Sequence, residues 1–385
     1  MRSPKQIWEI PALVVFGALL VWGAVTLVRW SARQGVADDG GGRLLEVDAG
    51  MPAELSSSLS EIRDRKLSLG APAWRTQRLA LGKGRLVWLG KADYLSLALP
   101  GFAAETHPLE GPRAALVVPG GSIVIVAERR TLRLDPGAKE PTLLARTPFL
   151  PGSELVPELR DSKRFWVRQR ATGSLVRYEL ALGEHLLLPN EGMVELPENA
   201  EGAFTTLREG SWIYATDQGL EVRLPGGKAR RFALDAAHRP WRLLPGPRVD
   251  EVWAITPKGG VRLYRVLDRL YQVLELELGR VPFDAAASEQ RLAVLGVVEG
   301  KGRREFGLTV FDKSGKVELD RELGADRAAP SEDWAARVLE REVALRDEPP
   351  LVALSDPAGL RVFELETGRL AYSAGGPAPP AKPAQ

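Results

Sequence analysis

The sequence of 385 residues contains no cysteine and only three histidines. Without cysteine the chain cannot perform thiol catalysis, ligate an iron–sulfur cluster, bind zinc through thiolates or carry a lipid on an N-terminal cysteine. His107, His185 and His238 stand far apart, and a zinc site needs three or four ligands, so we interpret them as surface or turn residues. We therefore predict no metal site and no cofactor.

Other motifs of catalysis are missing as well. The sequence has no Gly-x-Ser-x-Gly elbow, and no pair of glycosidase-type carboxylates can be identified in it. The glycine-rich turns at 119–122 and 225–227 lack the Gly-Lys-Ser/Thr ending of a phosphate-binding loop and are typical of hairpins. Asn190 and Asn199 are the only asparagines and lie close together, which argues against a calcium site built from several repeats. We assign no catalytic residue.

An excess of either charge is also absent. The chain has 52 Lys and Arg against 50 Asp and Glu, a net charge of +2. Residues 1–33 hold four basic side chains and one acidic side chain, so the rest of the chain has a net charge of −1. Because a nucleic-acid-binding protein needs a large cationic excess to displace counterions from phosphates, we predict no nucleic-acid partner.

The one long hydrophobic run covers residues 10–28, which include no charged side chain. At about 1.5 Å per residue a helix of this length crosses roughly 28 Å of hydrocarbon, which predicts one transmembrane helix. Trp8 and Trp30 flank it, where aromatic rings favour the membrane interface. A cleaved signal peptide would need a shorter run and a small-x-small site, whereas Arg29 and Trp30 follow this one. We favour an uncleaved anchor over a signal peptide or a buried soluble helix.

The segments around this run predict the topology. A basic tail of residues 1–9, one span and a large C-terminal body are typical of a signal anchor with its N-terminus in the cytoplasm. The protein is then a single-pass protein of the inner (cytoplasmic) membrane, and its body is extracytoplasmic, in the periplasm. Residues 29–52 form a glycine-rich linker, and 53–73 form a short amphipathic helix and a lead-in that pack on the body. The Pro/Ala-rich tail, 374–385, is predicted to be disordered.

From residue 74 to residue 373 one pattern recurs: a strand of β-branched and aromatic residues, a turn, a second alternating strand and a glycine-containing turn. The seven copies are 85–101, 122–137, 164–183, 210–227, 250–268, 291–315 and 350–368. The apolar residues that open their second strands are Leu95, Leu132, Val176, Val222, Val261, Leu308 and Leu360. A period of roughly 40–45 residues with several strands per unit is typical of a β-propeller blade.

Radial packing gives this pattern a physical reason. A small twisted antiparallel sheet cannot bury both of its faces alone, but in a ring each sheet covers its neighbour. A helical solenoid is disfavoured because strand-type alternation recurs between the turns. The fold class is therefore predicted to be all-β, a seven-bladed β-propeller with an N-terminal transmembrane helix.

Three segments carry a resemblance to a known family. They are GLRVFELETGRL (359–370), GGVRLYRVLDRL (259–270) and GSLVRYELALGE (173–184). They resemble the third strand and following turn of WD-type repeats and of bacterial membrane-associated propeller repeats. The chain lacks the Trp-Asp dipeptide and the Gly-His signature of the WD family, so the buried hydrogen-bond network tied to those residues is not expected here.

Two residue types recur within the copies. Five copies have arginine directly after the anchor residue, and the other two have serine or threonine: Arg133, Arg177, Arg223, Arg262, Arg361, Ser96 and Thr309. A ring of cations for an anionic partner is one interpretation, and we favour the other, the polar side of an outer strand. The tryptophans that recur in the first strands are Trp88, Trp166, Trp212 and Trp253. We favour rings that fill the gaps between blades over a ligand groove.

Two further segments have alternative interpretations. The basic stretch 160–170, in which Phe165 and Trp166 lie among arginines, fits a solvated strand better than a surface for nucleic acid or acidic glycans. Residues 330–350 have a Ser331 cap and apolar residues at near-helical spacing, which predicts a helix inserted before the last copy. The alternative is that this segment supplies the inner strand of the last blade.

These observations favour a membrane-anchored β-propeller that acts as a non-enzymatic protein-binding scaffold in an envelope-associated complex. Propellers bind through their loops and faces, and the fold alone does not determine the function. The alternative is a propeller enzyme or a carbohydrate-binding protein whose site is assembled at the central channel from several blades. Convergent carboxylates at the channel would favour the alternative, and an exposed apolar patch would favour the scaffold.

Overall fold

The computed structural model describes residues 77–146, 153–157, 164–169, 174–180, 187–195, 204–207, 211–223, 229–300, 303–326, 341–356 and 359–375. The chain divides into two units, Met1–Gly42 and Arg43–Gln385, and every described residue belongs to the second. The predicted anchor, linker and amphipathic helix, and the tail after residue 375, lie outside the described residues. Within the described ranges no helix has the length and hydropathy needed to cross a membrane.

The described residues form seven antiparallel sheets of four strands each. Sheet 1 contains β1 (Leu79–Gly82), β2 (Arg85–Leu89), β3 (Asp93–Ala98) and β4 (Ala103–Pro108), and sheet 2 contains β5 (Pro112–Val117), β6 (Ile123–Ala127), β7 (Thr131–Leu134) and β8 (Thr142–Ala145). Sheet 3 contains β9 (Ser153–Pro157), β10 (Arg164–Gln169), β11 (Ser174–Leu180) and β12 (Leu187–Glu195), and sheet 4 contains β13 (Phe204–Thr206), β14 (Trp212–Thr216), β15 (Gly219–Arg223) and β16 (Ala229–Ala233).

The other three sheets follow in the same order along the chain. Sheet 5 contains β17 (Arg242–Pro245), β18 (Glu251–Ile255), β19 (Gly260–Val266) and β20 (Leu270–Glu277), preceded by a short 3-10 helix, η1 (Ala236–His238). Sheet 6 contains β21 (Val281–Ala287), β22 (Arg291–Gly300), β23 (Arg303–Asp312) and β24 (Val317–Asp326), and sheet 7 contains β25 (Glu342–Arg346), β26 (Leu351–Asp356), β27 (Gly359–Glu364) and β28 (Leu370–Ala374).

All seven repeat copies coincide with the second and third strands of a sheet, and the three segments that resemble propeller repeats contain the third strands β11, β19 and β27. These central strands stand out in the sequence because they are buried on both faces. All five residues of β6 are buried. The outer strands give a weak signal, since β4 and β16 are exposed along most of their length.

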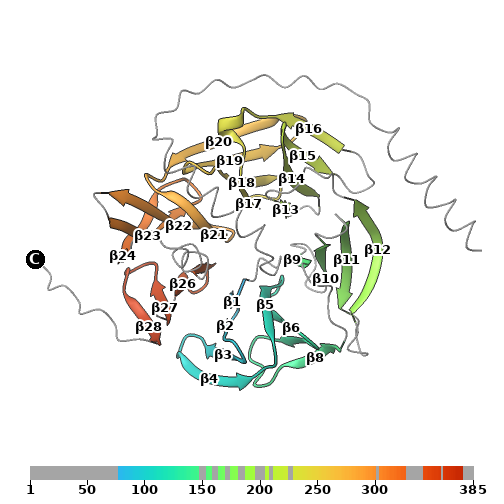
Figure 1. Cartoon of the computed structure of the whole chain (residues 1–385), viewed down its shortest axis with the longest axis vertical. Helices are drawn as coiled ribbons and strands as arrows, with labels where there is room; N and C mark the ends of the chain where they lie inside the picture. The colour runs from blue at the N-terminus through green and yellow to red at the C-terminus, as the bar shows by residue number, and fades with distance from the viewer. Residues whose placement is uncertain are drawn as a thin grey trace, which may run out of the picture. The chain divides into compact units, whose positions relative to one another are not determined.

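The first strands of the sheets lie side by side. Each contacts the first strand of the next sheet in the order β1, β5, β9, β13, β17, β21 and β25, and β25 contacts β1. Figure 1 shows these strands nearest the middle of the second unit, with the outer strands β4, β12, β16, β20, β24 and β28 at its rim. The row of first strands therefore closes on itself without exchange of a strand between sheets.

Apolar side chains fill the spaces between neighbouring sheets. Separate clusters lie between sheets 1 and 2, 4 and 5, 5 and 6, 6 and 7, and 7 and 1. In the last of these, Leu79, Leu86 and Leu97 of sheet 1 meet Leu351 and Val362 of sheet 7. Burial of each such side chain contributes about 1.5–3 kcal/mol, so the layer between sheets 7 and 1 holds the first and last sheets together.

Glycine is required at the hairpin turns before two third strands. Gly219 and Gly359 have φ values of +144° and +137°. A Cβ atom on either residue would lie 2.1 Å from a backbone oxygen of the outer strand, that of Phe232 or Ala374. The glycine-containing turns that mark the repeats in the sequence thus allow the outer strand to approach the third strand closely.

The prediction of a helix over 330–350 is wrong for the part of this segment that the structure describes. Residues Glu342–Arg346 form β25, the first strand of sheet 7, as the alternative interpretation held. Residues 327–340, with the predicted cap Ser331, lie outside the described residues. The helical spacing misled because β25 pairs with β26 and contacts β1 and β21, so tertiary contacts determine its conformation.

Hydrogen bonds from side chains reinforce the contact between sheets 7 and 1. The partly buried carboxylate of Glu342 accepts the backbone N–H groups of Arg78, at 2.5 Å, and Leu79, at 3.1 Å. Arg346, at the other end of β25, donates to the carbonyl oxygen of Gly82. Burial and the negative charge of Asp284 raise the pKa of Glu342 to about 8, although the two N–H groups favour its ionised form.

Glu342→Gln is expected to remove part of the pH dependence of stability. The folded-state pKa of Glu342 lies above its ordinary value of 4.5, so its contribution is complete below pH 4.5 and is lost as the pH rises through about 8. The variant should melt close to wild type at pH 5 and about 2–6 °C higher at pH 9, measured by circular dichroism. Glu342→Ala, which leaves two N–H groups without their acceptor, should melt lower at both pH values. Equal shifts for Glu342→Gln at both pH values would contradict this account.

Candidate functional site

The recurrent arginines lie on the third strands, and the four whose side chains are described are paired. Their partners are carboxylates of the same sheet: Arg133 binds Asp135, Arg223 binds Glu221, Arg262 binds Glu275, and Arg361 binds Asp356. Ser96 and Thr309 accept hydrogen bonds from Arg85 and Arg280. The side chain of Arg177 lies outside the described residues. The favoured interpretation, the polar side of an outer strand, is therefore wrong, because the outer strand is the fourth strand.

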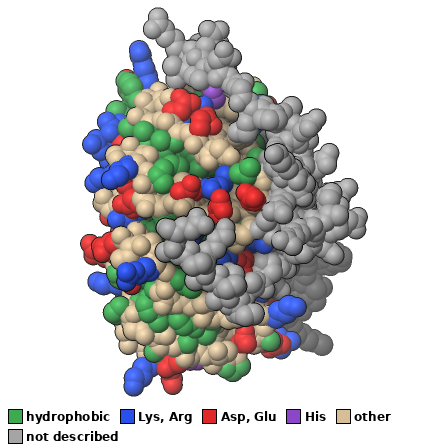
Figure 2. Space-filling model, turned by 90° about the vertical axis from the view of Figure 1, so that its left-hand side faces the viewer, with side chains coloured by type: hydrophobic (Ala, Val, Ile, Leu, Met, Phe, Trp, Pro, Cys, Tyr) green, Lys and Arg blue, Asp and Glu red, His purple; other side chains and the backbone are tan. Residues whose placement is uncertain are grey.

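These arginines do not form a ring of cations either. The anchor residue Val222 packs against sheet 5, which follows it, whereas Leu132 packs against sheet 1, which precedes it. Consecutive residues of a strand point to opposite faces of the sheet, so Arg223 points away from the following sheet and Arg133 points away from the preceding one. The two arginines therefore face opposite directions around the ring. Figure 2 shows acidic and basic side chains interspersed on the face in view, with hydrophobic side chains between them.

The most extensive of these polar clusters lies on sheet 4. Glu221 is 2% exposed, accepts a hydrogen bond from the hydroxyl of Tyr214 and pairs with Arg223 and Arg231 at 3.1 and 2.9 Å. Burial opposes ionisation of Glu221, but the hydrogen bonds from Tyr214 and both arginines outweigh it and hold the pKa of the carboxyl below its ordinary value. Burial and the neighbouring carboxylate raise the pKa of Tyr214. Because Tyr214 and the two arginines provide hydrogen bonds to both carboxylate oxygens of Glu221, we interpret the cluster as structural.

The recurrent tryptophans lie between sheets, as predicted. Trp88 packs with the cluster between sheets 7 and 1, and Trp253, which is fully buried, packs between sheets 5 and 6. Trp166 of sheet 3 meets Trp212 of sheet 4 edge to face, with ring centroids 4.9 Å apart. Trp166 is buried and β10 pairs on both sides, so the prediction of a solvated strand is wrong for this part of 160–170.

The histidines do not come together. His238 lies in η1, a turn as predicted, but it is buried, and desolvation together with the charge of Arg262 lowers its pKa. His107 lies on β4 at the molecular surface, 3.6 Å from Glu105. His185 and Asn199 lie outside the described residues, as does the side chain of Asn190. In the described ranges no three His, Cys, Asp or Glu side chains are grouped so that they could hold a metal ion.

Two carboxylates come together where sheets 6 and 7 meet, but both accept hydrogen bonds from backbone N–H groups. Asp284 of β21 accepts the N–H of Val343 at 2.9 Å, and its other oxygen lies 3.9 Å from Arg242 of β17. Glu342 accepts two N–H groups of sheet 1 in the same way. Both groups link one first strand to the next, which is the arrangement of a structural contact and not of an acid and base facing a substrate.

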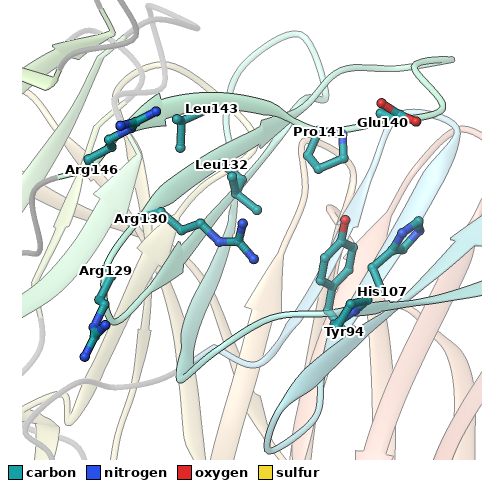
Figure 3. Close-up of a pocket in the computed structure, with 10 residues that line it drawn as sticks. Tyr94, His107, Arg129, Arg130, Leu132, Glu140, Pro141, Leu143 and Arg146 are labelled. Carbon is teal, nitrogen blue, oxygen red and sulfur yellow. The ribbon is translucent and has the colours of Figure 1, made fainter.

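A pocket of about 670 Å³ lies between sheets 1 and 2 (Figure 3). Tyr94 of β3 and His107 of β4 form one side of it, with their rings stacked at a centroid distance of 4.8 Å. Arg129 and Arg130 come from the turn between β6 and β7, and Arg146 follows β8. Burial raises the pKa of Tyr94, against the positive charges of Arg85 and Arg130. A volume of this size accommodates a small ligand or a short peptide segment.

Sequence reasoning missed this pocket. The Arg129-Arg130 pair was visible within the second repeat copy as two cations in a hairpin turn, the kind of loop that often carries binding residues. Tyr94 and His107 had no such signal, because they come together only through the pairing of β3 with β4.

A second surface feature is a group of exposed apolar side chains on the outer strand and the turns of sheet 5 and at the start of β24. Large hydrophobic side chains that are more than 40% exposed occur mostly on sheet 5 and the adjoining part of sheet 6. We call the group of Val249, Leu267, Tyr271, Val273 and Val317 the apolar wall. Val317 belongs with it because the preceding turn lies on β20, where a Cβ atom on Gly315 would come within 2.8 Å of Leu274. Leu370 of sheet 7 is the other such residue in the described part of the chain.

The chain matches no protein-family model and no curated protein. Among solved structures, a chain of the mitotic checkpoint complex is similar, with a TM-score of 0.51 and 8% identity over 73% of this chain and 87% of that chain. The fold is a β-propeller. Sqt1 of Saccharomyces cerevisiae and Hsv2p of Kluyveromyces lactis have TM-scores of 0.48 and 0.49, at 10% and 11% identity. These matches cover 77% and 79% of this chain, and 84% and 97% of the other chains. The predicted repeat fold is confirmed, and at these identities the similarity concerns the fold alone.

Glu221→Gln is expected to lower the free energy of unfolding at pH 7 by about 1–3 kcal/mol, because the buried carboxylate loses its charge-assisted hydrogen bonds to partly buried Arg223 and exposed Arg231. The folded-state pKa of Glu221 lies below its ordinary value of 4.5, so this stabilisation is present above pH 4.5 and is lost as the pH falls further. Urea denaturation followed by tryptophan fluorescence at pH 7 and pH 4 should show the larger difference at pH 7. Glu366→Gln, at an exposed position, is the matched control. A loss no greater than that of the control would contradict the structural role.

Proposed function

We propose that this chain is a membrane-anchored, seven-bladed β-propeller that acts as a non-enzymatic protein-binding scaffold in an envelope-associated complex. The apolar wall is the observation that carries the binding function. Its members on sheet 5 are between 44% and 56% exposed. Several large exposed apolar side chains on and around one sheet are typical of a protein interface.

The composition of the apolar wall supports a protein partner. Tyr271 supplies an aromatic ring with a polar end that lies 3.4 Å from Asp268, and Val273 supplies a β-branched side chain next to it. Tyrosine is enriched at the centres of protein interfaces. The neighbouring Arg269 and Gln272 would form a polar rim around this centre.

The anchor and the location belong to the same proposal. The uncharged run at 10–28, the basic tail before it and the linker after it support a single span in the inner membrane, with the propeller outside the cytoplasm. The linker of residues 29–52 gives the propeller room to meet a partner away from the bilayer.

Tyr271→Asp combined with Val273→Asp is expected to abolish recovery of the partner. The full-length chain, affinity-purified from detergent-solubilised membranes, should yield stoichiometric protein partners that the double variant loses, because each new carboxylate would be buried in the interface. Leu370→Asp, a similarly exposed position on sheet 7, is the matched control and should retain the partners.

Two results would count against the scaffold. If the double variant and the control lost the partners equally, the apolar wall would not be the interface. Recovery of no protein partner, together with turnover of a small substrate by the purified chain, would favour an enzyme with a channel site.

The anchor has its own test. Full-length chain should remain in the membrane pellet after alkaline carbonate extraction, and a chain that begins at residue 34 should be released. External protease should digest the propeller in spheroplasts. A full-length chain that carbonate releases, or a propeller that stays protected in spheroplasts, would contradict the anchor or its orientation respectively.

A further inference from the structure

The pocket between sheets 1 and 2 carries positive charge that no described residue neutralises. Within the described part of the chain, the guanidinium groups of Arg129, Arg130 and Arg146 form no hydrogen bond or ion pair. Arg133, only three residues further along the same hairpin, binds Asp135 at 2.6 Å. Glu140 is the only acidic residue that lines the pocket. The pocket therefore attracts anions by Coulomb forces, whereas acidic and basic side chains are interspersed on the face shown in Figure 2.

The cations are distributed and do not converge on one point. Figure 3 shows Arg130 extended toward Tyr94, Arg129 pointing to the other side of its turn, and Arg146 separate from both beyond Leu143. A single phosphate or carboxylate is bound best by donors that converge on it. Separated guanidinium groups fit a ligand that carries several negative charges along its length.

Apolar groups lie between these charges. Leu132, Leu143 and the prolines at 108 and 141 line the pocket. His107, whose side chain is 27% exposed, offers a ring that is held in place by its stacking on buried Tyr94. An aromatic or aliphatic side chain of a ligand can pack there, which a free polyanion would not require.

We propose that this pocket binds an acidic peptide segment of a protein partner, with Arg130 as the central cation and His107 as the platform for an apolar side chain of the peptide. The proposal rests on the scaffold function and names the chemistry of one partner. Short acidic motifs are commonly recognised by clusters of arginine, and the pocket has the volume for a few residues.

The test measures direct binding to the full-length chain in detergent. A fluorescein-labelled heptapeptide, Glu-Asp-Glu-Phe-Glu-Asp-Glu, is titrated in a fluorescence polarisation assay against its neutral isostere, Gln-Asn-Gln-Phe-Gln-Asn-Gln. We expect saturable binding of the acidic peptide that weakens as salt is raised, and no binding of the neutral one. Replacing the phenylalanine by glycine should weaken binding several-fold.

Arg130→Gln should reduce the affinity for the acidic peptide roughly tenfold, since it removes one charge-assisted contact. Arg130 is exposed, so the fold should persist, and an unchanged melting temperature would verify this. The matched control is Arg369→Gln, which removes the same charge from an exposed turn on sheet 7 and should leave the affinity unchanged.

Three results would overturn the proposal: no saturable binding of the acidic peptide, equal weakening by Arg130→Gln and Arg369→Gln, or displacement of the peptide by an equal concentration of inorganic phosphate. The last would assign the pocket to single anions. Failure of the peptide-binding proposal is distinguishable from failure of the scaffold function, because peptide binding is measured without any natural partner. Partners that depend on the apolar wall, combined with no peptide binding, would leave the scaffold standing and remove only this site.

Discussion

Burial of both faces of each four-stranded sheet is the constraint on which the rest of this structure depends. A single sheet of this size leaves both of its faces in water, and in this structure the sheets before and after it cover them. The clusters between sheets 4 and 5, 5 and 6, and 6 and 7 continue through the pair formed by sheets 7 and 1. Closure of the ring follows from the same burial that stabilises each sheet, so the two ends of the repeat array must meet.

The way in which the ends meet follows from the topology. Every sheet uses four strands that are consecutive in the sequence, so no strand from one end completes a sheet at the other. Packing and polar contacts between first strands must therefore join the first sheet to the last. Asp284 accepts one backbone N–H group of the next sheet and Glu342 accepts two, so both carboxylates hold neighbouring first strands together.

The surfaces proposed for binding depend mainly on side chains that do not take part in packing or pairing within the sheets. Paired arginines such as Arg262, which is 4% exposed, are used up within the sheets. Two surface features of the described residues are not used within the sheets: the apolar wall, and the guanidinium groups of Arg129, Arg130 and Arg146 in the pocket between sheets 1 and 2. A rigid body with distinct binding surfaces on separate sheets suits a scaffold that holds more than one segment of its partners.

The sequence by itself determined the repeat, the strand type and the central strands, because residues such as those of β6 are buried on both faces and must be apolar. It also indicated the inter-sheet position of Trp166 and Trp212. It could not determine which way Arg133 and Arg223 face, since a shift of one residue in the pairing of a strand turns every side chain to the other face. It also could not determine that Glu342 begins a strand and not a helical turn. The pocket was likewise decided only by tertiary structure: Tyr94, His107 and Arg130 lie on different strands and turns, and nothing in their spacing requires that they meet. Local patterning records which residues are buried, whereas a site depends on which distant residues share a surface, and that is settled when the sheets pack.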